Sequence, residues 1–192
     1  MREKELIELI LDNNVLTVGT EFILKSGERS DHFYDFGMLN SAESLSILAC
    51  HMVASIYGDT YTSIFTSAYK GIMLASALLF ECGTDFPNIK FKLGFLRKEA
   101  KDHGEEGIVV GYCPGPGDIV VLVDDVLTSG QSLLEMAKFV KSTGATIESA
   151  IVVVRRAEPN DQSKLEKELG CPICCLVTDE AVMAKFIRSK RK

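Results

Sequence analysis

The 192-residue sequence contains no uninterrupted apolar run as long as the roughly 18 residues that a membrane span needs. Residues 1–5 carry charges of both signs, unlike a secretory signal peptide. Basic charge is scarce as well: 21 Lys and Arg stand against 27 Asp and Glu, for a formal net charge of -6. We therefore expect no membrane association and no general binding of nucleic acid. The basic residues 188–192 are interpreted as the solvated end of a helix.

The six cysteines lack the dense, regular spacing of a disulfide-rich secreted domain. Cys50 and Cys82 fall in apolar helical patterns and are interpreted as core residues. Residues 171–175 contain a Cys-x2-Cys pair, but no second Cys or His pair stands at zinc-finger spacing, so a strand is favoured there over a metal site. This usage of cysteine indicates a reducing compartment, the cytoplasm.

Helical and extended apolar patterns alternate along the chain, without repeats, low-complexity tracts or linkers. Helices are expected at 4–11, 40–57, 71–80, 132–143, 161–169 and from 180 onward, and extended segments at 21–24, 32–36, 63–65, 91–96, 108–111, 119–123, 147–154 and 173–177. Asn40 and Glu43 form a candidate capping box. The charged residues 97–107 have no apolar stripe and are expected to form a mobile loop.

This alternation predicts an α/β fold with a mostly parallel central sheet flanked by helices. The length fits one domain over residues 1–192. We expect residues 1–40 to contribute a small hood over the carboxyl edge of the sheet, together with the carboxyl-terminal elements. That edge is where α/β sheets bind their ligands.

The most informative segment is the run 119–132. Its apolar, β-branched start is typical of a buried parallel strand, and Asp124 and Asp125 follow directly. Residues 128–132 are small and mostly polar and lead into a helix, whose first N–H groups suit a phosphate. Two carboxylates can accept hydrogen bonds from sugar hydroxyls or orient the waters of Mg²⁺. The run predicts a site for a phosphorylated ribose, and the lack of Gly-Lys-Ser/Thr after the strand excludes a Walker A motif.

Further residues add charge and aromatic surface to this site. Lys70 follows a buried strand at the start of a helix, where a cation can hold a second anion. Phe33 and Tyr34 suit a flat heterocycle, although aromatic residues in strands are usually core residues.

The run 119–132 resembles the phosphoribosyl pyrophosphate (PRPP) motif of the type I phosphoribosyltransferases. Lys25-Ser-Gly, Ala68-Tyr-Lys-Gly71 and the string Arg97-Lys-Glu-Ala-Lys-Asp-His-Gly104 precede it in the order found in the orotate phosphoribosyltransferase family. The resemblance extends from about residue 15 to about residue 157. One departure is visible, because Thr66-Ser67 stands where the family usually has Gly-Pro.

The resemblance implies the type I phosphoribosyltransferase fold and transfer of a phosphoribosyl group from PRPP to orotate, with Mg²⁺. The products would be orotidine 5′-monophosphate and pyrophosphate, in de novo pyrimidine biosynthesis. Catalytic roles are implied for Lys98, Lys101, His103, Asp124 and Asp125. PRPP would contact Lys25, Tyr69, Lys70, Arg97, Lys98, Lys101, His103, Asp124, Asp125, Val126, Leu127, Thr128, Ser129, Gly130, Gln131 and Ser132. Orotate would contact Lys25, Phe33, Tyr34, Thr128 and Arg156.

The resemblance also implies a homodimer with shared active sites, in which Lys98 and its loop neighbours serve the partner's site. Mg²⁺ would be coordinated by PRPP and water molecules. Asp124 and Asp125 would accept hydrogen bonds from these water molecules, and no protein group would coordinate the ion directly. We expect no fused decarboxylase domain, so that the next reaction takes place on a separate protein. Two alternatives stay open: another base such as uracil, hypoxanthine or xanthine, and a PRPP-sensing regulator without catalysis.

Overall fold

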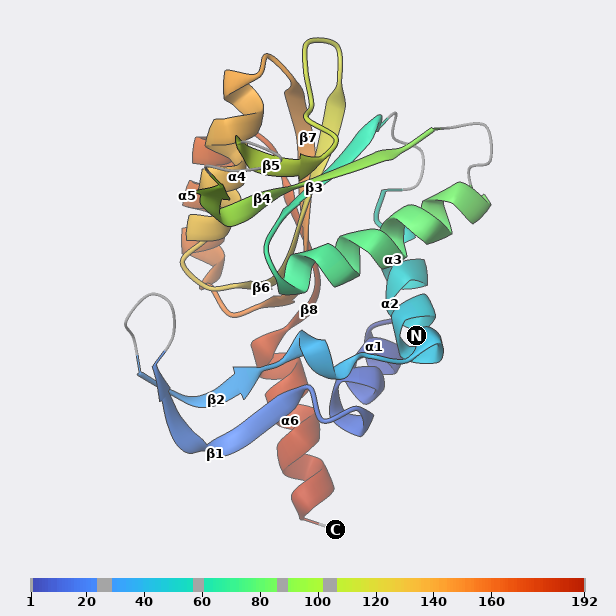
Figure 1. Cartoon of the computed structure of the whole chain (residues 1–192). Helices are drawn as coiled ribbons and strands as arrows, with labels where there is room; N and C mark the ends of the chain where they lie inside the picture. The colour runs from blue at the N-terminus through green and yellow to red at the C-terminus, as the bar shows by residue number, and fades with distance from the viewer. Residues whose placement is uncertain (1, 24–28, 57–60, 86–89, 102–106, 192) are drawn as a thin grey trace.

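The computed structural model describes residues 2–23, 29–56, 61–85, 90–101 and 107–191, built around a six-stranded sheet (Figure 1). The strand order is β5-β4-β3-β6-β7-β8. The strands are β3 (Ser63–Ser67), β4 (Lys92–Lys101), β5 (Gly107–Gly111), β6 (Ile119–Leu127), β7 (Thr146–Arg155) and β8 (Ile173–Thr178). Every neighbouring pair is parallel except β4 and β5, which are antiparallel. The predicted α/β architecture with a mostly parallel sheet is confirmed.

Helices cover both faces of the sheet (Figure 1). They are α1 (Arg2–Asp12), α2 (Ala42–Val53), α3 (Lys70–Asp85), α4 (Gln131–Ser142), α5 (Pro159–Leu169) and α6 (Asp179–Lys190). Helix α3 packs against β3 and β6, while α4 packs against β6 and β7. None of the described helices has the length and apolar content of a bilayer-spanning segment.

Strand β6 explains how the sheet separates two hydrophobic cores. Val121 and Val123 belong to the core on one face, and Val120 and Leu122 belong to the core on the other. All four side chains are fully buried. Because successive side chains of a strand point to opposite faces, a strand covered on both sides must be apolar throughout. This requirement accounts for the unbroken apolar run that precedes Asp124.

A two-stranded antiparallel hairpin lies beyond the carboxyl ends of the parallel strands (Figure 1). It consists of β1 (Leu16–Ile23) and β2 (Arg29–Tyr34) and continues into the short 3-10 helix η1 (Phe36–Met38). Helix α1, also within the predicted hood, packs against α2, α6 and β8. The hairpin therefore stands over the sheet edge at which a ligand was expected.

Three local expectations were wrong. Cys50 was expected in the core but is exposed on α2, whereas Cys82 is buried as expected. The capping box of α2 is formed by Ser41 and Ser44, not by Asn40 and Glu43, because the Ser41 hydroxyl accepts the Ser44 N–H at 3.1 Å. Residues 97–101 do not form a loop, since β4 continues through them to Lys101. Residues 102–106 of the expected loop lie outside the described residues, and its mobility stays a prediction.

Candidate active site

A cavity of about 430 Å³ opens at the carboxyl ends of the parallel strands, beneath the hairpin. Many of the predicted site residues line it: Phe33, Tyr34, Tyr69, Lys70, Lys98, Asp124, Asp125, Val126, Thr128, Ser132 and Arg156. They come from β2, the β3–α3 connection, β4, β6, α4 and the end of β7. Residues far apart in the sequence therefore meet around one space, with charged groups of both signs on its walls.

Other predicted residues are placed differently. Leu127 is buried in the core, so only its backbone is available to a ligand. Ser129, Gly130 and Gln131 form the turn and helix start beside the cavity but do not line it. Lys25 and His103 lie outside the described residues, as does the side chain of Lys101. Their assignments stay predictions.

The acidic pair lies where β6 extends past its neighbour β3. Strand β3 pairs with β6 only as far as Val123, whereas β6 remains paired with β7 through Leu127. Oδ1 of Asp124 accepts the Asp125 N–H at 3.0 Å, and Oδ1 of Asp125 accepts the Val126 N–H at 2.9 Å. These bonds orient both carboxylates at the cavity wall. Carboxylate oxygens suit Mg²⁺ and its waters, so the residues present fit that ion.

The turn after β6 is shaped for a phosphate. Gly130 has a φ of 75° and caps α4 without a side-chain hydrogen bond to the first turn. A Cβ at this position would overlap with the Leu165 side chain. Glycine is thus required by the backbone angle and by packing. The first N–H groups of α4 have no side-chain cap, and Thr128 and Ser132 line the cavity beside them.

Lys70 is tied to the hairpin. Its Nζ lies 3.0 Å from Oδ1 of Asp35, donates to the Tyr34 carbonyl at 3.3 Å and sits 4.5 Å from the centre of the Phe33 ring. The hydrogen bond from Lys70 lowers the pKa of the Asp35 carboxyl below its usual value. Sequence reasoning missed Asp35, although its place directly after the Phe33-Tyr34 pair was a signal. Nor did it find the cis peptide bond between Ala68 and Tyr69, because no proline marks it.

Two neighbouring cations of β4 differ in the cavities that they line. Lys98 lines the cavity of its own chain, with Nζ 4.6 Å from the centre of the Tyr69 ring, and also borders an adjacent cavity. Arg97 lines the adjacent cavity but not the first one. Lys98 thus lines the cavity of its own chain, and the expectation that it serves the partner's site stays a prediction.

The hairpin and the end of β7 form the opposite wall of the cavity. NH2 of Arg156 donates to the Ser30 hydroxyl at 2.8 Å, and the Arg156 N–H donates to the Leu127 carbonyl at 2.8 Å. The Tyr34 hydroxyl donates to Oδ1 of Asp179 at 2.7 Å. Burial is the main cause that raises the Tyr34 pKa far above its usual value, and this hydrogen bond is the second cause. The hydroxyl therefore stays protonated. Asp179 was not predicted, although it lies two residues after the predicted strand 173–177.

The residues that replace the family's Gly-Pro have a structural role. Thr66 is buried, and its hydroxyl donates to the Val123 carbonyl at 2.8 Å. This bond joins β3 to β6 immediately before Asp124. Ser67 lines the cavity. The loop that carries Lys70 is therefore anchored to the strand that carries the acidic pair.

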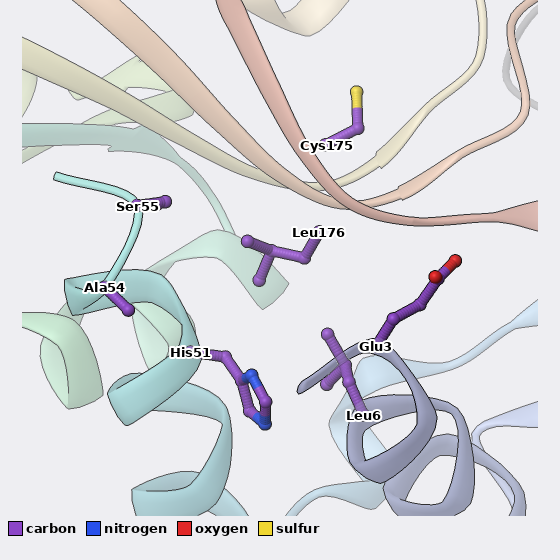
Figure 2. Close-up of a pocket in the computed structure, with 7 residues that line it drawn as sticks. All are labelled: Glu3, Leu6, His51, Ala54, Ser55, Cys175 and Leu176. Carbon is purple, nitrogen blue, oxygen red and sulfur yellow. The ribbon is translucent and has the colours of Figure 1, made fainter. Parts of the chain in front are cut away.

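A second cavity of about 190 Å³ lies between α1, α2 and β8, away from these charged strand ends (Figure 2). His51 and Cys175 both line it, but the Cys175 sulfur points away from the His51 ring. Burial raises the pKa of the Cys175 thiol to about 12, which disfavours the thiolate that metals bind. Among the described residues, no three His, Cys, Asp or Glu side chains are grouped to hold a metal ion.

Comparison with known proteins places this geometry in context. Residues 37–182 match the family described as the phosphoribosyl transferase domain. The chain is 38% identical over 188 residues to an orotate phosphoribosyltransferase of Acinetobacter baumannii, covering 92% of this chain and 83% of that protein. It is 35% identical to that of Marinobacter nauticus, covering 94% and 86%. The crystal structure of the enzyme from Aeropyrum pernix is similar with a TM-score of 0.77 and 26% identity, covering 94% and 97%.

Proposed function

The chain belongs to the phosphoribosyl transferase family, and from this premise we propose that it transfers the phosphoribosyl group of PRPP to orotate. The products are orotidine 5′-monophosphate and pyrophosphate, in pyrimidine biosynthesis. The observation that best supports this function is a cavity whose two walls carry different chemical groups. Asp124, Asp125, Thr128 and Ser132 lie on one side of it, and Arg156 lies on the other together with the hairpin aromatics.

The β6–α4 segment is assigned to PRPP. The 5′-phosphate lies at the start of α4, where backbone N–H groups and the Thr128 and Ser132 hydroxyls donate to it. Asp124 and Asp125 accept hydrogen bonds from the ribose hydroxyls. The pyrophosphate lies toward Lys70 and Lys98, whose charges stabilise the leaving group as the carbon–oxygen bond breaks. Arg97, Lys101 and His103 are assigned to the same pyrophosphate.

Phosphoribosyltransferases of this family use a metal ion, and we assign Mg²⁺ here. Asp124 and Asp125 would hold it through its waters, together with oxygens of PRPP. When bound, the ion neutralises charge that develops on the pyrophosphate.

The opposite wall is assigned to orotate. Arg156 donates to the orotate carboxylate, and its link to Ser30 fixes one edge of the guanidinium before the ligand arrives. Phe33 and Tyr34 contact the ring, Thr128 reaches it from the PRPP side, and Lys25 completes the pocket. The ring nitrogen that attacks the ribose then faces the carbon losing pyrophosphate.

We assign a homodimer with shared active sites. Phe80 of α3 is 78% exposed and Tyr69 is 69% exposed, and large exposed apolar side chains of this kind are typical of interfaces. The six cysteines, all among the described residues, are not joined in disulfides, which supports a reducing cytoplasm.

The test is an ultraviolet assay of orotate consumption with PRPP and Mg²⁺, with and without a chelator. We expect one pyrophosphate released for each orotate consumed, and loss of activity when the chelator is added. A panel of uracil, hypoxanthine and xanthine serves as control and should give no product. Consumption of one of these bases in place of orotate would overturn the assigned substrate.

A further inference from the structure

The inner face of β2 carries polar side chains where an ordinary hairpin would bury apolar ones. Ser30, His32 and Tyr34 alternate along the strand and are 9%, 7% and 2% exposed. Alternation places all three on the face turned toward the sheet. Buried polar groups need partners, because leaving one unpaired costs free energy. The partners of these three side chains show what holds the hairpin in place.

Two of the three side chains meet on one carboxylate. Oδ1 of Asp179 accepts the Tyr34 hydroxyl at 2.7 Å and lies 2.8 Å from Nε2 of His32. The other ring nitrogen of His32 lies 2.7 Å from Oδ1 of Asp31. Asp179 is the first residue of α6, where the helix dipole stabilises a negative charge. A single side chain therefore fixes two positions of β2.

Asp179 is not needed to cap its own helix. Thr178 occupies the N-cap, and its hydroxyl accepts the Ala181 N–H at 3.3 Å. Among the described residues, the hydrogen bonds of the Asp179 carboxylate lead to the hairpin alone. Asp179 is not among the described residues that line the cavity of about 430 Å³, so we expect it to act on a ligand through other residues.

The third inward side chain connects the same strand to Arg156. The Ser30 hydroxyl accepts NH2 of Arg156 at 2.8 Å and donates to the His32 carbonyl at 2.6 Å. Arg156 and Tyr34 both line the cavity. A shift of β2 would therefore disturb Tyr34 and Arg156, two of the residues that the proposed function assigns to orotate. It would leave the β6–α4 segment, which is assigned to PRPP, in place.

We propose that Asp179 is a positioning residue of the base subsite, holding β2 so that Tyr34 and Arg156 face orotate in a fixed geometry. This inference rests on the proposed function and deepens it, because it makes the start of α6 a determinant of base binding. A binding group displaced by a fraction of an ångström loses much of its hydrogen bonding to a planar carboxylate.

The test compares Asp179→Ala and Asp179→Asn with Glu180→Gln, which removes a charge from the same helix turn. Loss of a hydrogen bond to a charged group should raise the KM for orotate about tenfold in Asp179→Ala. The KM for PRPP should rise less than the KM for orotate, because Lys70 contacts β2 whereas the β6–α4 segment that holds the rest of PRPP does not. Asp179→Asn keeps an acceptor for Tyr34 and should give a smaller rise in the orotate KM. Glu180→Gln should match the wild type.

A folded, active Asp179→Ala with unchanged orotate KM overturns the inference, and so does an equal rise for both substrates or an equal effect of Glu180→Gln. If Asp179→Ala does not fold, the same comparison uses Asp179→Asn. Amide exchange of residues 29–34 gives a readout that needs no activity: it should quicken in the Asp179 variants only, and unchanged exchange overturns the inference. A wild type that consumes no orotate refutes the proposed function instead, so the two failures are distinguishable.

Discussion

The hydroxyl of Thr66 occupies the space that a side chain on residue 71 would need. A Cβ built on Gly71 would overlap with Thr66 Oγ1, while Thr66 Cβ would lie 3.4 Å away. The same hydroxyl donates to the Val123 carbonyl at 2.8 Å. The choice of Thr at position 66 and the need for Gly at position 71 are therefore coupled.

Gly71→Ala should destabilise the protein by about 1–3 kcal/mol, because the new methyl group overpacks against Thr66. Thr66→Ala removes the hydroxyl and should cost about 1 kcal/mol for the lost hydrogen bond. The double variant should be destabilised by less than the sum of the two single variants, and the difference should be at least about 1 kcal/mol. Urea unfolding of the four proteins measures this coupling. Additive losses would contradict the contact.

Asp125→Asn should lower turnover by about 100-fold or more, because the ribose and the waters of the metal lose a charged acceptor. Asp125 is only partly buried and lies at a cavity wall, so the fold should remain intact. Steady-state kinetics and a thermal melt measure the two effects. Asp161→Asn, at an exposed ion pair with Lys164, is the control and should leave turnover unchanged. Wild-type turnover in Asp125→Asn would refute the assignment of that carboxylate.

Lys98 and Arg97 should differ in which subunit they serve. Lys98 lines the cavity of its own chain, and Arg97 does not. Heterodimers can be purified by two different tags, pairing Asp125→Asn with either Lys98→Ala or Arg97→Ala. The Arg97→Ala pair should recover about half of wild-type turnover. If Arg97 serves the partner's site, one of the two active sites in this heterodimer contains both Asp125 and Arg97.

The Lys98→Ala pair should recover no activity, because each of its sites lacks one group. Recovery with both pairs would place Lys98 in the partner's site after all. Recovery with neither pair would argue against a shared site, provided that light scattering shows dimers.

Arg156→Ala should lower kcat/KM for orotate by about 10- to 100-fold, the effect of losing charged hydrogen bonds to a carboxylate. The KM for PRPP should change little. Arg155→Ala removes the neighbouring cation, whose NH1 bonds Gln162 at 3.4 Å, and serves as the matched control. Equal losses for both substrates in Arg156→Ala would count against a carboxylate contact.

The ion pair between Asp35 and Lys70 should give a small, pH-dependent stabilisation. Folding lowers the Asp35 pKa, so the pair stabilises the fold above the unfolded-state pKa of about 3.9. That contribution is lost as the pH falls through the lower folded-state pKa. Both side chains are over a third exposed, so solvent screening leaves at most about 1 kcal/mol.

Asp35→Asn should thus lower the Tm by about 1–3 °C at pH 7, and the difference should be smaller at pH 3, because the contribution of the pair is lost as the pH falls through the lowered pKa of Asp35. Circular dichroism melts at the two pH values measure it. A larger difference in Tm between wild type and variant at pH 3 than at pH 7 would contradict a stabilising ion pair.

Features set by local residue order were predictable from the sequence. The strand before Asp124, the turn at Gly130 and the glycine caps follow from hydrophobic pattern and backbone preference. The placing of Arg156 beside the hairpin was expected only through the family resemblance, since the pattern of one strand does not show which distant segment covers its end. The start of α2 was misplaced by one residue because Asn40, Ser41 and their neighbours offer competing caps.

The features that were missed depend on contacts between distant segments. Residues 97–101 look like a charged loop, yet pairing with residue 107 and beyond keeps them extended in β4. Asp179 carries no motif, and its role arises only because β2 and α6 meet in space.

The central claim is that PRPP lies across the carboxyl ends of the parallel strands. A crystal structure of the protein soaked with PRPP and Mg²⁺ tests it most directly. We predict the 5′-phosphate at the start of α4, the ribose hydroxyls against Asp124 and Asp125, and the pyrophosphate toward Lys70 and Lys98. Density for PRPP at any other surface, with the cavity at the strand ends empty, would contradict the account.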